Sequence, residues 1–241
     1  MIKKIIRRLL KRGSFVRGSI NLNTRVGALH KAWGYIFSNH IFGDYVEFGV
    51  YQGDSFIAST EEYLKFKKWL DEQKNSNESW RQDVAKKSPL NEKVVFHGLD
   101  TFEGMPKNNE DEILFKEKSF LSNFDDVKKR IKYKEIDFRL YKGTFNKSEN
   151  IFKKNIENKN ISIANIDCDI YDSTIDAFKM IKNNLSIGSI IMLDDYNSFS
   201  ANNLKGQRKA LIEFQETSNL ILEPFFTYMY VGQAFIVVGK K

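Results

Sequence analysis

Short apolar runs alternate with amphipathic stretches along most of this chain, a pattern that is typical of an α/β protein. The clearest example joins an apolar run at 161–166 to another at 190–193 through a connector of helical spacing at 173–185. A strand, a helix and a strand of this length form a βαβ unit, whose two strands lie parallel in one sheet. The pattern therefore predicts a mainly parallel sheet covered by helices.

The same periodicities predict the other elements of the chain. A polar surface excursion with a short helix near Trp80 is expected at 74–93, and a charged loop that closes over a substrate is expected at 107–121. The closing hairpin, with its turn at Val231 and Gly232, would give the sheet one antiparallel strand. Helices are expected at 24–42, 55–70, 206–214 and from a cap at Ser122 to about residue 133, and strands at 45–50, 94–99, 138–141, 223–230 and 233–238.

Acidic residues follow both strands of the βαβ unit. Asp167 and Asp169 come directly after the first strand, and Asp194 and Asp195 after the second. Neighbouring parallel strands end at the same edge of a sheet, so these carboxylates should crowd one rim, where open α/β sheets bind ligands. Like charges repel there unless they share protons or a cation, and oxygen ligands suit Mg²⁺. We predict a divalent cation; the alternative is that single aspartates only cap the following helices.

The first strand ends in a turn that carries two glycines, E-F-G-V-Y-Q-G-D-S at 47–55. Gly49 and Gly53 lack the Cβ atoms that would keep a ligand away from the backbone, and the following helix offers free amides. The spacing differs from the three-glycine pattern of dinucleotide binders, so a ligand with an amino acid head suits it better. An ordinary turn is the alternative. Asp100, at the end of the second strand, is a candidate for binding ribose hydroxyls.

Composition and charge exclude several classes of protein. A hydrophobic content of 41% is sufficient for a packed core, and the single cysteine, Cys168, excludes internal disulfides and multi-cysteine zinc sites. We expect Cys168 to point away from its acidic neighbours and to pack under a helix. The net charge of +7 arises from nine basic and no acidic residues within residues 1–43. Because this excess is local and no nucleic-acid-binding motif accompanies it, no nucleic-acid partner is expected.

The first ten residues form one amphipathic pattern. Aliphatic side chains at helical spacing occupy one face, Lys and Arg occupy the other, and Gly13 offers a stop. Residues 1–12 could contact an anionic membrane surface peripherally, or pack on a partner subunit of a homo-oligomer or on the chain itself. No apolar run approaches the roughly 18 residues of a membrane span, which favours a cytoplasmic protein. We therefore divide the chain into an extension at 1–23 and a domain at 24–241.

Four separated segments together resemble the macrocin O-methyltransferase family. They read D-Y-V-E-F-G-V-Y-Q-G-D-S at 44–55, G-L-D-T-F-E-G-M-P at 98–106, I-D-C-D-I-Y-D-S-T at 166–174, and L-D-D-Y with a downstream G-Q-R-K-A at 193–210. The family comprises class I S-adenosylmethionine-dependent methyltransferases that act on sugar hydroxyls of macrolides and related glycosides. The resemblance implies a Rossmann-like α/β fold, with a seven-stranded mainly parallel sheet, an antiparallel last strand and helices on both faces.

The resemblance also assigns roles to residues at matching positions. The first segment would line the methionine end of S-adenosylmethionine, the second would hold its ribose, and Gly143 and Thr144 would lie by the adenine. Three aspartates would hold Mg²⁺, and Asp167 or Asp169 would be the base. The assigned residues are Glu47, Phe48, Gly49, Tyr51, Gly53, Ser55, Asp100 and Thr101 for the cofactor, and Asp167, Asp194 and Asp195 for the metal.

The expected acceptor is a hydroxyl of a sugar, glycan or glycoside building block. The basic N-terminus and the charged loop at 107–121 depart from the family's antibiotic enzymes, and acceptor choice would depend on such segments. Two alternatives stay open from the sequence. One is a methyltransferase that acts on a non-sugar hydroxyl, and the other is a membrane-surface binding or scaffold protein that retains the fold.

Overall fold

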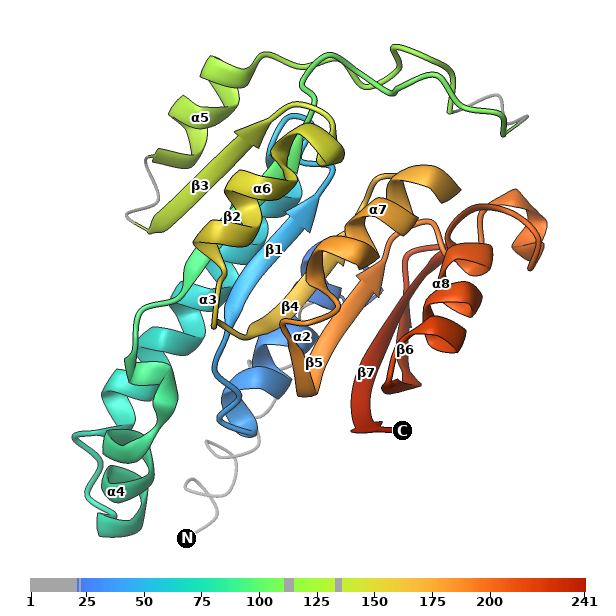
Figure 1. Ribbon diagram of the computed structural model, residues 1–241. Coiled ribbons are helices and arrows are strands. Elements are labelled where there is room, and N and C mark those ends of the chain that lie inside the picture. Colours follow the sequence, from blue (N-terminus) through green and yellow to red (C-terminus); the bar gives the residue numbers. More distant parts are fainter. Residues whose placement is uncertain (1–20, 22, 111–114, 133–135) are drawn as a thin grey trace, which may run out of the picture.

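The sheet has the predicted topology. The computed structural model describes residues 21, 23–110, 115–132 and 136–241. Within them, one sheet runs in the order β3-β2-β1-β4-β5-β7-β6 (Figure 1). Strands β1 to β5 pair in parallel, whereas β7 is antiparallel to both β5 and β6. The strands are β1 Asp44–Phe48, β2 Val95–Asp100, β3 Asp137–Lys142, β4 Ile161–Ile166, β5 Leu185–Leu193, β6 Leu220–Tyr228 and β7 Gly232–Lys240.

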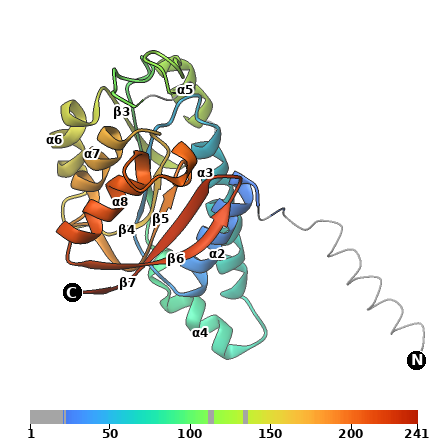
Figure 2. The ribbon, with the colours of Figure 1, turned by 90° about the vertical axis from the view of Figure 1, so that its right-hand side faces the viewer.

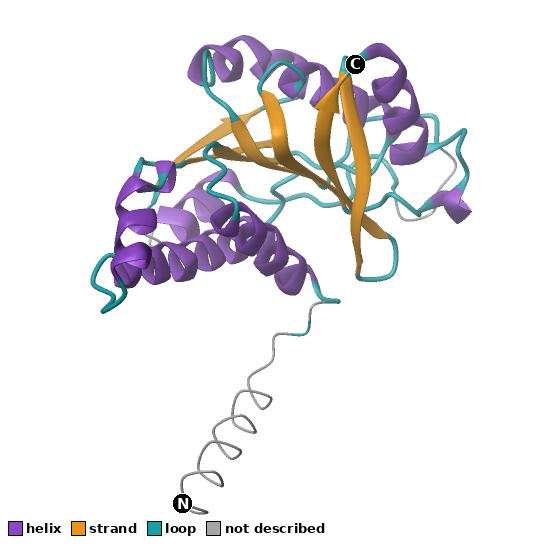
Figure 3. Ribbon diagram, turned by 90° about the horizontal axis from the view of Figure 1, so that it is seen from below, coloured by secondary structure: helices purple, strands orange, loops and turns teal. Residues whose placement is uncertain are grey.

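Helices cover both faces of this sheet, as predicted (Figures 2 and 3). One face is covered by α2, α3 and α5, and the other by α6, α7 and α8. The short helix expected near Trp80 is α4, which follows α3. The helices are α2 Arg25–Ser38, α3 Asp54–Gln73, α4 Ser79–Lys87, α5 Phe124–Lys132, α6 Phe145–Asn155, α7 Tyr171–Ile181 and α8 Gly206–Thr217, with short 3₁₀ turns at Pro89–Asn91 and Phe199–Ala201.

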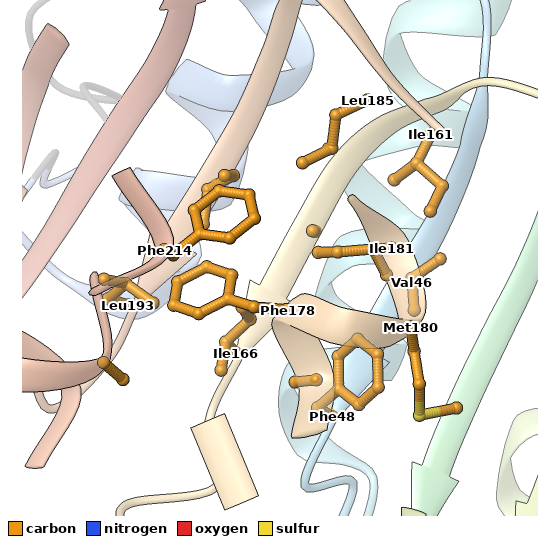
Figure 4. Packing of buried hydrophobic residues seen from close by; sticks show 14 of the residues in the cluster. Val46, Phe48, Ile161, Ile166, Phe178, Met180, Ile181, Leu185, Leu193 and Phe214 are labelled. Atoms are coloured by element: carbon orange, nitrogen blue, oxygen red, sulfur yellow. The ribbon is translucent and has the colours of Figure 1, made fainter. Parts of the chain in front are cut away.

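The two faces hold separate apolar cores, because successive residues of each strand point to opposite sides. Tyr45 of β1 packs with Trp33 of α2, whereas its neighbour Val46 faces α6, α7 and α8. In this second core, Phe178 of α7 stacks on Phe214 of α8, with ring centroids 4.3 Å apart (Figure 4). Burying one side chain of this size stabilises the fold by about 1.5–3 kcal/mol. These contacts fix the helices against the sheet, and so fix the loops at its edge.

The boundary between α7 and β5 differs from the sequence prediction. The helix ends at Ile181 and the strand begins at Leu185, although 173–185 was predicted as helix and the strand was predicted from 190. Gly188, at φ 90°, and two serines interrupt the apolar run. The Ser189 hydroxyl donates to the Ile161 carbonyl at 2.6 Å and accepts from the Ser186 amide at 2.9 Å. These bonds carry the strand through an irregularity that hydrophobic periodicity cannot reveal.

The predicted N-cap of helix α5 was also wrong. Helix α5 begins at Phe124, and the side chain of Asn123 caps it by accepting from the amides of Asp125 and Asp126 at 3.0 and 3.1 Å. Ser122 lies one residue too early, and its hydroxyl is buried with no partner among the residues that the structure describes. Both residue types favour caps, so sequence alone did not separate them.

Helix α2 ends at Ser38, four residues earlier than predicted. At its other end, Thr24 is the N-cap, and its hydroxyl accepts from the Gly27 amide at 3.0 Å. The predicted basic helix at residues 1–12, and its membrane or subunit contacts, lie outside the described residues. In the part of the chain that the structure describes, no helix combines the length and the apolar character needed to cross a membrane.

Candidate active site

The carboxyl ends of β2, β1 and β4 are tied together at one edge of the sheet. The Gly49 amide donates to the Leu99 carbonyl at 2.9 Å, and the Asp167 amide donates to the Phe48 carbonyl at 2.8 Å. The strand order reverses between β1 and β4, which is where open α/β sheets form a ligand crevice. The segments singled out from the sequence therefore meet at the point where a site is expected.

The two glycines after β1 have a structural role. Gly49, at φ 90°, packs so closely that a Cβ would overlap the Asp167 carbonyl group and lie only 2.7 Å from its carbon. Gly53, at φ 88°, would place a Cβ 3.2 Å from Val127 of α5. Both positions need glycine for backbone conformation and close packing. The space beside Gly49 is filled by the backbone of Asp167 rather than left open for a ligand, whereas contact of either glycine with the cofactor stays a prediction.

Glu47 lies beneath this turn and has no solvent exposure. Its carboxylate accepts hydrogen bonds from the Tyr45 hydroxyl, from Ser55 of α3 at 2.7 Å and from Asn165 of β4 at 3.2 Å. Burial raises the pKa of Glu47 to about 7, and these hydrogen bonds oppose that rise. Glu47 thus joins β1 to the start of α3 and to β4. Direct contact of Glu47 with a cofactor stays a prediction.

Asp100 connects three segments that were assigned to the cofactor: the turn after β1, the end of β2 and the turn after β3. Its side chain accepts from the amides of Tyr51 and Phe102 at 2.7 and 2.6 Å, and its carbonyl accepts from the Gly143 amide at 2.9 Å. Burial raises the pKa of Asp100. The Thr101 hydroxyl closes the local turn by donating to the Gly104 carbonyl at 2.8 Å. The predicted ribose carboxylate therefore also holds the backbone of the turn after β1.

Thr144, the other residue assigned to the adenine, is the residue that precedes α6. It occupies the N-cap position, but its side chain makes no capping hydrogen bond. Phe145, the first residue of α6, packs edge to face on Phe48, with centroids 5.1 Å apart. Phe48 itself is fully buried. The structure therefore places Thr144 at this edge of the sheet and Phe48 beneath it, whereas their cofactor contacts stay predictions.

The predicted crowding of carboxylates is confirmed. Asp167, Asp194 and Asp195 each place one oxygen within 4.8 Å of the others. The Asp169 side chain interacts with the Asp195 carboxylate, and the Asp169 backbone has φ 62°, which is unusual for a residue with a side chain. Burial raises the pKa of Asp167, Asp169 and Asp195, and repulsion from the neighbouring aspartates adds to the rise for all three. All four aspartates singled out from the sequence thus gather at one rim.

Cys168 is a packed residue, as predicted, and His97 is packed as well. Cys168 is buried among side chains of α7, with its sulfur 3.8 Å from the Thr174 hydroxyl, and burial raises the pKa of its thiol. His97 lies within β2 between Asp44 and Tyr141, at 3.1 and 2.9 Å. The hydrogen-bond partners of both side chains are residues other than the four aspartates of the rim.

Sequence reasoning missed Arg25, the first residue of α2. Its guanidinium bridges two of the aspartates, with Nη1 3.1 Å from Asp167 Oδ2 and Nη2 in close contact with Asp194 Oδ2. From the sequence, Arg25 was only one of the basic residues near the N-terminus. One signal was present, since a cation in the first turn of a helix opposes the helix dipole and so needs another reason to be there.

Sequence reasoning also assigned no role to Gln207, although it quoted the G-Q-R-K-A segment. Gln207 is fully buried in the first turn of α8. Its side chain accepts from the Asp195 amide at 3.0 Å and donates to the Ile166 carbonyl at 3.0 Å. It therefore holds the end of β4 and the turn after β5 at a fixed separation, which sets the spacing of the aspartates.

Unpaired buried polar atoms are concentrated at this rim. Among the described residues, three of the five buried side-chain nitrogen or oxygen atoms without a hydrogen-bond partner belong to it, namely Arg25 Nε, Asp195 Oδ2 and the Tyr228 hydroxyl. Tyr228 ends β6, and its pKa is raised by burial and then by Asp194 and Asp167. Buried polar groups are nearly always paired in proteins, so this concentration marks a place for a further polar partner. Three converging carboxylates with one free oxygen fit a hard divalent cation.

The described parts of the predicted charged loop, 107–110 and 115–121, lie across the edge of the sheet, on the side of α7 and α8 (Figure 1). Glu110 joins the loop to both helices, because its carboxylate accepts from the amides of Tyr171 and Gly206 at 3.0 and 2.7 Å. Phe115 packs on Phe199, with centroids 5.4 Å apart. An anionic side chain is stabilised at a helix N-terminus, and here one carboxylate serves two.

Comparisons with known proteins agree with this geometry. The family model described as macrocin-O-methyltransferase (TylF) matches residues 82–232, which is more than half of the chain. No curated protein sequence matches significantly.

Solved structures share the fold. The O-methyltransferase NovP is 18% identical, with a TM-score of 0.64 over 89% of this chain and 80% of that one. The calicheamicin methyltransferase CalS11, also described as a TDP-rhamnose 3′-O-methyltransferase, is 16% identical, with a TM-score of 0.60 over 88% and 77%. TomG from Streptomyces achromogenes, in complex with S-adenosylmethionine, is 11% identical, with a TM-score of 0.52 over 88% and 80%.

The family match covers the end of β2, the acidic rim and the Gln207 segment, and the shared fold extends over nearly the whole chain. The chain therefore belongs to the macrocin O-methyltransferase family and is an O-methyltransferase.

Proposed function

We propose that the protein transfers the methyl group of S-adenosylmethionine to a hydroxyl of a sugar or of a glycan or glycoside building block, and that Asp167, Asp194 and Asp195 hold a divalent cation for this reaction. The observation that carries the proposal is the close packing of Gly49 on Asp167. It joins the turn of the cofactor segment to the acidic rim. A methyl donor in the β1 crevice would therefore lie beside these carboxylates.

The sugar class of the acceptor is supported by the family and by the fold neighbour described as a TDP-rhamnose 3′-O-methyltransferase. The buried, carboxylate-rich rim adds a chemical reason. Neighbouring sugar hydroxyls offer several donors and weak ligands, which suit a site of carboxylates and a cation. A simple apolar acceptor would leave these charged groups unpaired.

The reaction forms one bond and breaks one bond. The acceptor oxygen attacks the methyl carbon, the carbon–sulfur bond breaks, and S-adenosylhomocysteine leaves as a neutral thioether. The hydroxyl proton passes to a carboxylate. Because the sulfonium is already a good leaving group, the protein contributes alignment and placement of charge rather than covalent catalysis.

The metal assignment rests on the three converging oxygens and on the unpaired Asp195 Oδ2. A divalent cation at this position would lower the pKa of a hydroxyl that binds to it. Gln207 and the strand ends hold the three aspartates at their spacing. The rim thus supplies the ligands, and the fold supplies their geometry.

Asp169 is our choice for the base. It lies on the same rim but outside the group of three converging carboxylates, so a cation does not need its oxygens. Its positive φ of 62° is the kind of backbone strain that persists at functional sites. Asp169→Asn should therefore lower the rate of methyl transfer without lowering the affinity for the cation.

Calorimetric titration with S-adenosylmethionine, with and without Mg²⁺, tests the cofactor and the metal separately. We expect binding of the cofactor in both conditions and a separate Mg²⁺ isotherm that Asp194→Ala removes. Nucleotide sugars, glycosides and lipid-linked glycans are then offered as acceptors in the presence of both. No binding of S-adenosylmethionine would favour a scaffold protein that only retains the fold, and methylation of non-sugar hydroxyls alone would overturn the acceptor class.

A further inference from the structure

We propose that Arg25 competes with the divalent cation for the acidic rim: its guanidinium holds Asp167 and Asp194 together, and binding of the cation requires it to leave. The inference rests on the metal role proposed above. It gives Arg25 a function that is distinct from the chemistry of methyl transfer, namely control over when the metal site can be filled.

The guanidinium uses the oxygens that a cation needs. Asp167 Oδ2 and Asp194 Oδ2 both contact Arg25, and these two residues belong to the three whose oxygens converge within 4.8 Å. A divalent cation binds carboxylate oxygens directly, at about 2.0–2.6 Å. A guanidinium and a cation on the same pair of carboxylates would place two positive charges in contact distance, where they repel. Only one of them can occupy the rim in full.

Among the described residues, Asp167 and Asp194 are the only hydrogen-bond or ion-pair partners of the Arg25 side chain. Its Nη atoms contact Asp167 and Asp194, and its Nε is buried with no partner. About a third of the side chain, 35%, is accessible to solvent. A guanidinium that leaves the rim would therefore give up no other hydrogen bond, and it would have a route to water.

The backbone at Arg25 is held independently of the guanidinium. The Thr24 hydroxyl caps α2 through the Gly27 amide at 3.0 Å, and the Met229 amide donates to the Asn23 carbonyl at 2.7 Å. These bonds leave the helix in place when the side chain moves. The exchange we propose is therefore a rotation of one side chain rather than a movement of α2.

The exchange has a consequence for stability. Three ionised carboxylates this close repel one another, and a positive charge among them relieves that repulsion in either arrangement. Arg25 supplies it from within the chain. When the metal is bound, the divalent cation supplies the positive charge instead. A protein without Arg25 should therefore depend on the divalent cation for its stability.

The test compares Arg25→Gln with the wild-type protein and with Lys31→Gln. Lys31 lies on the same helix, over the ring of Phe226, so its variant removes the same charge without touching the rim. Mn²⁺ affinity is measured by calorimetry, and thermal unfolding is followed in excess EDTA and in excess Mn²⁺. We expect Arg25→Gln to bind Mn²⁺ at least about tenfold more tightly than wild type. In EDTA it should unfold at a lower temperature than wild type, and this difference in unfolding temperature should be smaller in Mn²⁺. Lys31→Gln should follow wild type in each measurement.

Equal or weaker Mn²⁺ binding by Arg25→Gln, with clear binding by wild type, would overturn the competition and leave the metal site standing. If neither protein binds Mn²⁺, the metal role itself falls, and the competition falls with it. Arg25→Lys covers the case in which the glutamine variant does not fold. A lysine cannot bond both carboxylates with a planar fork, so it should give a Mn²⁺ affinity above that of wild type, and an affinity at or below wild type would contradict the proposal.

Discussion

Gly49 at the end of β1 and Asp167 at the end of β4 are packed backbone to backbone. A Cβ on Gly49 would overlap the Asp167 carbonyl, and the Asp167 amide is itself bonded to Phe48. The turn that the cofactor segment forms and the first aspartate of the acidic rim are therefore parts of one rigid structure. A change on one side of this contact must displace the other.

Gly49→Ala should destabilise the protein on the order of 3 kcal/mol, because the new methyl group meets backbone and the residue must keep φ 90°. Chemical denaturation measures the loss. Gly239→Ala is the matched control, since its Cβ would meet only Ile221 at an ordinary 3.5 Å. If Gly49→Ala is as stable as that control, the turn is not tied to the rim.

Gln207→Leu should loosen the rim while keeping the volume of the side chain. It leaves the Asp195 amide and the Ile166 carbonyl unpaired, at a cost on the order of 3 kcal/mol. Loss of a group that orients metal ligands typically lowers metal affinity about 10–100-fold, which a Mn²⁺ titration would detect. Gln215→Leu, on the same helix, serves as the control. Unchanged metal affinity in Gln207→Leu would show that Gln207 does not position the aspartates.

The stability of the fold should depend on pH through Glu47. Its pKa is raised from 4.5 to about 7 by burial, so between these values the folded state binds more protons than the unfolded state. The free energy of unfolding therefore falls as pH rises through this window, by up to about 3 kcal/mol. Glu47→Gln removes this dependence, whereas the exposed control Glu216→Gln keeps it. Urea unfolding at pH 5 and pH 8 measures this. The free energy of unfolding of Glu47→Gln relative to wild type should be higher at pH 8 than at pH 5. An equal difference at both pH values would contradict the raised pKa of Glu47.

Deletion of residues 1–12 tests the basic segment. Its cations each contribute on the order of 1 kcal/mol at an anionic surface, so we expect salt-sensitive co-sedimentation with anionic liposomes that the deletion removes. Activity on a soluble acceptor should persist. Loss of an oligomer in size-exclusion chromatography, with no liposome binding by the full chain, would instead identify the segment as a subunit contact.

Sequence patterns predicted the fold and the location of the site for a physical reason. Alternating apolar runs specify parallel strands, and parallel strands bring their carboxyl ends together, so Asp167 and Asp194 had to meet. The terminal hairpin and the packed Cys168 follow from the same periodicity. These features depend on local pattern and simple topology.

Features that depend on distant contacts could not be predicted in this way. Arg25 contacts Asp194, which lies 169 positions away in the sequence, and no sequence pattern predicts a contact over that separation. The partners of Gln207 lie on other elements, and Gly49 needs glycine because of β4 rather than because of a ligand. The start of β5 depends on the hydrogen bonds of Ser189. Each of these residues is of an ordinary type in an ordinary local pattern.

The most direct test of the account is a methyl-transfer assay with S-adenosylmethionine that carries a trideuterated methyl group. Nucleotide sugars and glycosides are offered as acceptors, and products are identified by mass spectrometry in Mg²⁺, in excess EDTA and with Asp194→Ala. We predict one labelled methyl group on a sugar hydroxyl in Mg²⁺, and a rate at least about a hundredfold lower with EDTA or with Asp194→Ala. Undiminished transfer in EDTA by wild type and by Asp194→Ala would contradict the metal site on which the account depends.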